Sequence, residues 1–84
     1  MALGRAIREI RADRGVGVAQ LATASGVDLR RIAALEAGRL DPTYELLLAL
    51  GDALGVSVSA FVIRAEELVE EPPAGEGGSR ETAT

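Results

Sequence analysis

Apolar residues recur at the spacing of a helix face through most of this chain. Leu3, Ile7 and Ile10 form the first such stripe. No segment shows the alternation of apolar and polar residues that marks a half-buried strand, so the pattern predicts an all-α fold. Five helices are expected, over residues 2–14, 18–24 and 28–37, from Asp41-Pro42-Thr43 to Gly55, and over residues 57–69. The fourth of these helices has two candidate N-caps, Asp41 and Thr43.

The second and third predicted helices are short, and Ser25-Gly26-Val27 joins them. Glycine suits this turn because a left-handed backbone conformation there excludes most other residues. Asp28 is a good N-cap for the third helix, and Ile32 and Leu35 are its expected buried residues. Two short helices joined by a tight, glycine-containing turn are typical of the DNA-binding helix-turn-helix motif. The sequence predicts this motif over residues 17–38.

The length of 84 residues corresponds to a single domain. We expect this domain to occupy residues 1–70. The stretch 71–84 contains Pro-Pro and three glycines but no large apolar residue. Such a segment cannot bury enough surface to offset the loss of chain entropy on folding, so it is predicted to be a disordered, acidic tail.

The net charge of −4 is unusual for a protein that binds DNA, but the charge is unevenly distributed. Residues 1–39 carry seven arginines and four acidic residues, whereas residues 40–84 carry two arginines and nine acidic residues. Binding in a DNA groove depends on the local field at the contact face. The predicted helix-turn-helix lies in the basic half, and the acidic half is expected to weaken non-specific DNA binding.

Histidine and cysteine are absent from the sequence, which removes the commonest general base and the commonest metal ligands. No glycine-rich loop suited to phosphates is present, and the carboxylates lie on faces predicted to be exposed. We therefore expect no enzymatic activity, no metal and no cofactor. No apolar run is long enough to span a membrane, and the N-terminus lacks the apolar core of a signal peptide. A cytoplasmic protein without membrane partners is expected.

Residues between Leu3 and Leu68 carry a family resemblance, and they are Leu3, Ile7, Arg11, Gly15, Leu21-Ala22, Ser25-Gly26-Val27, Ile32, Leu35-Glu36, Gly38, Pro42, Leu46, Ala53-Leu54-Gly55-Val56 and Phe61. Their order and spacing resemble the Cro/XRE family of phage-repressor-like helix-turn-helix proteins. The resemblance implies a compact five-helix bundle of the lambda-repressor-like type. It also implies a bacterial or phage transcriptional regulator, repressor-like, that binds operator DNA as a homodimer with helix 28–37 in the major groove.

Mapped by position, the resemblance assigns base reading to Leu29, Arg30 and Ala34. It implies that five further residues lie on or near the DNA backbone, namely Asp28, Arg31, Ala33, Arg39 and Arg11. Arg11 and Glu36 also occupy positions at which family members often form an ion pair between the first and third helices. For this pair we favour a structural role.

The chain departs from the family pattern in two ways that bear on DNA recognition. Gly17-Val18 stands where members often have Ser-Gln, so this chain lacks a supporting interaction with DNA. Leu29, Ala33 and Ala34 are apolar and cannot hydrogen-bond to base edges, so direct readout depends on Arg30. These departures support an alternative function, in which the same fold serves as a protein-interaction module or antitoxin-type component with weak or no DNA specificity. Its partner would be a toxin or another regulator.

The last predicted helix supplies three candidates for a dimer interface, Phe61, Ile63 and Leu68. Phe61 and Leu68 lie on the apolar stripe of this helix and are also candidates for the core, whereas Ile63 lies off the stripe. Dimerisation would separate the two recognition helices by about 34 Å, which matches a palindromic operator over one turn of duplex.

Overall fold

The computed structural model describes residues 2–68, which form five α-helices with no strand among them. The helices are α1 (Leu3–Asp13), α2 (Val18–Ser25), α3 (Leu29–Glu36), α4 (Tyr44–Leu54) and α5 (Val58–Leu68). The prediction of an all-α, five-helix fold is therefore confirmed. The tail predicted over residues 71–84 lies outside the described residues.

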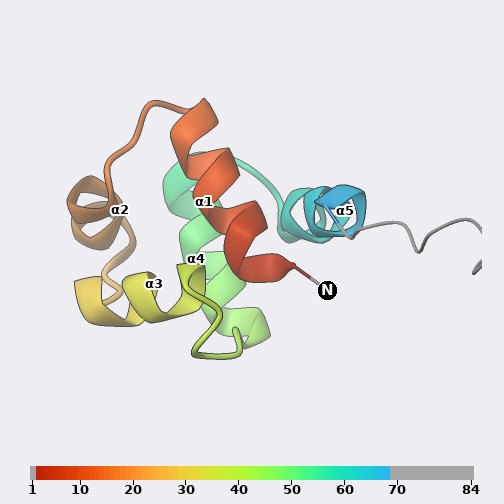
Figure 1. Cartoon of the computed structure of the whole chain (residues 1–84). Helices are drawn as coiled ribbons and strands as arrows, with labels where there is room; N and C mark the ends of the chain where they lie inside the picture. The colour runs from red at the N-terminus through yellow and green to blue at the C-terminus, as the bar shows by residue number, and fades with distance from the viewer. Residues whose placement is uncertain (1, 69–84) are drawn as a thin grey trace, which may run out of the picture.

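The helices form a bundle in which α1 packs against α3 and α5, while α2 packs against α3 and α4. In Figure 1, α2 and α3 lie together at one side, α5 lies at the opposite side, and α1 crosses in front of α4. The helix-turn-helix pair is thus separated from α5 by the crossing of α1 and α4. This arrangement leaves the outer surfaces of α2 and α3 free on one side of the domain.

Every helix contributes at least one large side chain to a single core. No charged or polar residue within 2–68 is buried, so apolar packing alone fills this core. The largest side chains that are fully buried are Ile7 of α1, Leu21 of α2, Ile32 and Leu35 of α3, Leu50 of α4 and Phe61 of α5.

The burial of Phe61 corrects its inclusion among the candidates for a dimer interface. Its side chain has no exposed surface and lies over α4, where a Cβ added at Gly51 would be 3.5 Å from the ring atom Cε2. The ring fills the space that the glycine leaves. Ile63 is 54% exposed and Leu68 is half-buried, so these two residues remain available at the surface of α5.

Side-chain caps mark where α3 and α4 begin. Asp28 accepts a hydrogen bond from the backbone N–H of Arg30 at 3.0 Å, as expected of an N-cap. Thr43 Oγ1 accepts from the backbone N–H of Leu46 at 3.1 Å, so Thr43, and not Asp41, caps α4. The two caps satisfy backbone donors that the helices themselves leave unpaired.

Within residues 2–68 no single helix is long and apolar enough to cross a membrane. Helices α4 and α5 reach that length and composition only when they are taken together, across a bend of 101°.

Candidate nucleic-acid interface

The turn between α2 and α3 is held by its own hydrogen bonds. Ser25 Oγ donates to the carbonyl oxygen of Leu21 at 2.6 Å and accepts from the backbone N–H of Val27 at 3.2 Å. Gly26 has φ of 76°, a left-handed conformation that favours glycine. Val27 is buried, which ties the turn to the core. The angle between α2 and α3 is therefore set by local contacts as well as by packing.

Helix α3 has one buried face and one exposed face. Ile32 and Leu35 point into the core, whereas Leu29, Arg30 and Ala33 are exposed. Of the residues expected to read bases, Leu29 and Arg30 therefore lie at the surface, and Ala34 is half-buried on the same helix. The helix presents short or apolar side chains around a single outward arginine, Arg30, with Arg31 on the adjoining side.

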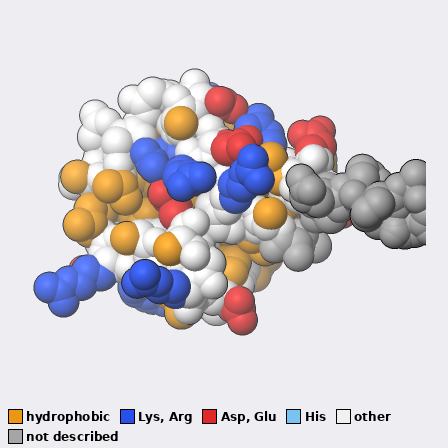
Figure 2. Space-filling model, viewed as in Figure 1, with side chains coloured by type: hydrophobic (Ala, Val, Ile, Leu, Met, Phe, Trp, Pro, Cys, Tyr) orange, Lys and Arg blue, Asp and Glu red, His pale blue; other side chains and the backbone are white. Residues whose placement is uncertain are grey.

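Several exposed arginines on and near α3 make no ion pair within the described part of the domain. Within the described residues, ion pairs involve Arg5, Arg11 and Arg64. Arg30, Arg31 and Arg39 are exposed and make no ion pair among residues 2–68. Figure 2 shows basic side chains gathered over α3 and over α1 on the same face of the molecule. The charges near α3 are thus available to an external anion.

Arg11 and Glu36 form the ion pair between α1 and α3 that the resemblance implied. The guanidinium group donates from Nε to Oε2 at 2.7 Å and from Nη2 to Oε1 at 3.0 Å, so the contact is bidentate. Nη1 donates in addition to the carbonyl oxygen of Val16 at 2.9 Å. The hydrogen bond to Glu36 raises the pKa of Arg11, against the opposing effect of burial.

The same geometry limits what Arg11 can do at a DNA surface. Its side chain is 16% exposed and that of Glu36 is 10% exposed. Three of its N–H groups already have protein acceptors. The pair therefore positions α3 against α1 and leaves little of Arg11 for a phosphate contact.

Gly4 is a second determinant of the position of α3, and it is not among the residues singled out from the sequence. A Cβ at this position would overlap the carbonyl oxygen of Leu35, and it would lie 3.2 Å from that of Glu36. The backbone of α1 thus touches the C-terminal end of α3, where only glycine fits. A glycine inside a helical pattern often has such a packing reason, and this signal was present in the sequence.

Arg64 of α5 is a further residue whose role the sequence pattern did not reveal. It pairs with Asp13 at 3.0 Å and with Glu9 at 3.3 Å, both on α1, and with Glu67 at 3.7 Å. The hydrogen bond to Asp13 raises the pKa of Arg64, with Glu9 acting in the same direction. These contacts link α5 to α1 on the side of the bundle away from α3, so Arg64 belongs to the scaffold.

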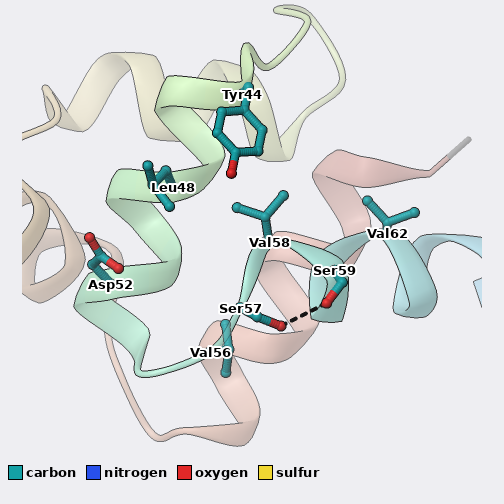
Figure 3. A pocket seen from close by; sticks show the side chains of 8 residues that line it. All are labelled: Tyr44, Leu48, Asp52, Val56, Ser57, Val58, Ser59 and Val62. Carbon is teal, nitrogen blue, oxygen red and sulfur yellow. Dashed lines mark hydrogen bonds between the residues drawn. The ribbon is translucent and has the colours of Figure 1, made fainter.

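A groove lies between α4 and α5, outside the helix-turn-helix. Its volume is about 590 Å³. Figure 3 shows Tyr44 and Leu48 on α4 facing Val58 and Val62 on α5, with Ser57 and Ser59 hydrogen-bonded at the edge. A second hollow of about 400 Å³ lies along α2, at Ala19, Gln20, Thr23 and Ala24. The α4–α5 groove is mostly apolar, and Asp52 is the one charged residue in its lining.

Comparison with known proteins identifies the family. A model of the helix-turn-helix domain matches residues 2–61, which is most of the chain. The chain therefore belongs to the helix-turn-helix domain family, and the resemblance to DNA-binding regulators of the Cro/XRE kind is confirmed. No match was found among curated proteins.

Solved structures give a closer comparison. The chain is similar to ClgR, the clp gene regulator of Corynebacterium glutamicum, in two crystal structures. Sequence identity is 44% and the TM-score is 0.75 in both, over 79% of this chain. The alignment covers 70% of the chain in one ClgR structure and 85% in the other. Family and fold together define a helix-turn-helix protein of the transcription-regulator class.

Proposed function

We propose that this protein is a sequence-specific transcriptional regulator that binds operator DNA as a homodimer, with α3 in the major groove. The observation that carries the proposal is the exposed face of α3, where Arg30 and the small side chain of Ala33 both lie at the surface. The opposite face of the same helix is anchored in the core by Ile32 and Leu35. A helix held in this way can enter a groove without disturbing the domain.

The exposed arginines have different roles in this proposal. Arg30 lies at the second position of α3, is exposed, and its guanidinium group makes no ion pair among residues 2–68. A guanidinium group suits guanine because it donates to O6 and N7 together. Arg31 at the side of α3 and Arg39 in the loop after it are assigned to phosphates, which supply affinity without sequence preference.

Asp28 has a structural task that limits its role at the DNA. One of its carboxylate oxygens accepts the backbone N–H of Arg30 and so caps α3. Its negative charge also favours the N-terminus of a helix. We assign Asp28 to helix capping, with the consequence that its carboxylate opposes close approach of a phosphate at this point.

The homodimer is proposed to form through the side of the domain that carries α5. Ile63 is 54% exposed there, and the half-buried Leu68 lies five residues further along the same helix. The apolar α4–α5 groove adjoins this surface through Val62. A two-fold axis at this side leaves both copies of α3 free, as a palindromic operator requires.

Selection of DNA from a random duplex pool tests the proposal. Purified protein is incubated with the pool at about 0.15 M salt, because weaker screening favours non-specific binding. The expected result is an enriched palindrome with half-sites about 10 bp apart.

Sedimentation of wild type and of Ile63→Asp then tests the dimer, and we expect the variant to be monomeric at concentrations where the wild type is dimeric.

A second candidate function is favoured by the apolar surfaces. Leu29 and Ala33 on α3 and Tyr44 and Leu48 on α4 are exposed, and apolar surface of this kind also suits a protein partner. This candidate is an interaction module, such as an antitoxin-type component, that has kept the fold. It predicts that folded protein enriches no sequence from the pool and that any DNA binding is weak and sensitive to salt.

A further inference from the structure

Leu29, the first residue of α3, lies outside the apolar core of the domain. It is 44% exposed, and it belongs neither to the core cluster nor to the apolar residues packed against that cluster. Val27 before it and Ile32 after it are both buried. Val27 and Ile32 thus belong to the core, whereas Leu29 lies at the surface beside Arg30.

Leu29 does not stand alone on its side of α3. Ala33 follows one turn later and is exposed as well. At 100° per residue, Leu29 and Ala33 are about 40° apart around the helix axis, and Arg30 lies about 60° beyond Ala33. The outward face of α3 therefore has an apolar side, made by Leu29 and Ala33, next to its charged residue. The small side chain of Ala33 also allows a base edge to approach closely.

Only one group on the base edges of the major groove matches such a surface. Alkyl side chains cannot hydrogen-bond, and the 5-methyl group of thymine is the apolar feature that the groove presents. We propose that Leu29, flanked by Ala33, reads the 5-methyl group of a thymine in each half-site, beside the base contacted by Arg30. This inference rests on the proposed function, because it requires α3 to lie in the major groove.

The contact recognises a methyl group and not the hydrogen-bonding pattern of thymine. Carbon 5 of cytosine lies at the same place on the pyrimidine edge, so 5-methylcytosine presents a methyl group at the same position. The inference therefore includes a consequence for modified DNA. A cytosine at this position binds more tightly when it is methylated at carbon 5.

Removal of single methyl groups tests this contact. Each thymine of the selected operator is replaced in turn by deoxyuracil, which lacks only the 5-methyl group. We expect one thymine in each half-site whose replacement weakens binding by the wild type about fourfold, the effect of leaving one apolar carbon unburied. With cytosine or 5-methylcytosine at the same position, the methylated duplex is expected to bind more tightly by a similar factor. Equal binding of the two would contradict the inference.

Two variants assign the effect to Leu29. In Leu29→Ala the ratio of affinities for the thymine and uracil duplexes is expected to fall towards one. Leu48→Ala is the matched control, because Leu48 is 42% exposed and lines the groove between α4 and α5, and it should keep the wild-type ratio. Circular dichroism establishes that both variants are folded. A wild-type-like ratio in Leu29→Ala would overturn the assignment.

The outcomes separate this inference from the proposed function. If folded wild-type protein enriches no duplex, the proposed function fails and the methyl contact fails with it. If an operator is enriched but none of its thymines is sensitive to loss of the methyl group, only the methyl contact is wrong.

Discussion

Gly4 of α1 lies against the carbonyl oxygen of Leu35 in α3, so closely that no side chain fits between the two helices. The next residue, Glu36, binds Arg11 of α1 through both carboxylate oxygens. One contact joins the two backbones, and the other joins the two side chains. Together they hold the C-terminal end of α3 against α1, and so determine how the exposed face of α3 is presented.

Replacement of Gly4 by alanine is expected to destabilise the domain. The added methyl group forces α1 and α3 apart, at a cost of about 1 to 3 kcal/mol in the free energy of unfolding. This range is the net loss expected, after the better helix propensity of alanine has offset up to about 1 kcal/mol of the steric cost. Urea unfolding measures the difference. Gly17→Ser, at a helix N-cap with room for a side chain, is the control and should change stability by a few tenths of a kcal/mol. A Gly4→Ala variant as stable as the wild type would show that the helices are not this close.

Loss of the bidentate ion pair between Arg11 and Glu36 should also destabilise the fold. We expect Arg11→Ala to lower the free energy of unfolding by about 1 to 3 kcal/mol, between the values for exposed and buried pairs. Arg11→Lys should recover only part of this loss, since an ammonium group cannot donate to both oxygens in the same plane. Because the pKa of Arg11 is raised in the folded state, its charge stabilises the fold throughout neutral pH, and this contribution disappears only in strongly alkaline solution. If Arg11→Lys had the same free energy of unfolding as the wild type, donation to both oxygens of Glu36 would not be important for stability.

Leu35→Ala tests the core beneath the recognition helix. Leu35 is almost fully buried, and truncation of such a leucine costs about 2 to 5 kcal/mol. Leu48→Ala removes the same atoms from a side chain that is 42% exposed, and it should cost much less. Thermal unfolding of both variants measures the difference. Equal melting temperatures for the two would show that α3 is not anchored through Leu35.

Arg31 and Arg39 are expected to contribute affinity without specificity. Replacement of either by alanine should weaken binding to all duplexes alike. It should also make the dependence of the binding constant on salt less steep. The magnitude of the slope of log K for binding against log salt concentration should fall by about 0.9 for each phosphate that is no longer neutralised, and by about twice that in a dimer. Arg64→Ala changes the net charge equally but lies on α5, so its salt slope should match the wild type. An unchanged slope for both Arg31→Ala and Arg39→Ala would remove them from the interface.

The helices could be predicted from the sequence because each apolar stripe is a local signal. The same signal could not decide whether Phe61 faces the core or a partner, since both surfaces demand an apolar residue. The structure places it over Gly51, in the core. The choice between Asp41 and Thr43 as the cap of α4 likewise depended on which side chain reaches a free N–H, a matter of backbone geometry.

Contacts between distant parts of the chain were harder to predict. The close approach at Gly4 depends on the separation of two helices, and the pairing of Arg64 with Asp13 depends on how α5 crosses α1. Neither separation nor crossing is encoded by periodicity. The pair of Arg11 and Glu36 was expected only because the chain resembles a known family.

The most direct test of the proposed function is whether Arg30 reads a base. Equilibrium binding of wild type and Arg30→Ala is measured with the selected operator and with duplexes in which one guanine at a time is changed. The wild type should lose affinity at one guanine in each half-site by a factor that corresponds to about 1 to 3 kcal/mol. Arg30→Ala should be folded, bind the operator as weakly as the changed duplex, and no longer distinguish the two. A folded Arg30→Ala variant that binds the operator with wild-type affinity and preference would contradict the proposal that α3 recognises DNA through this residue.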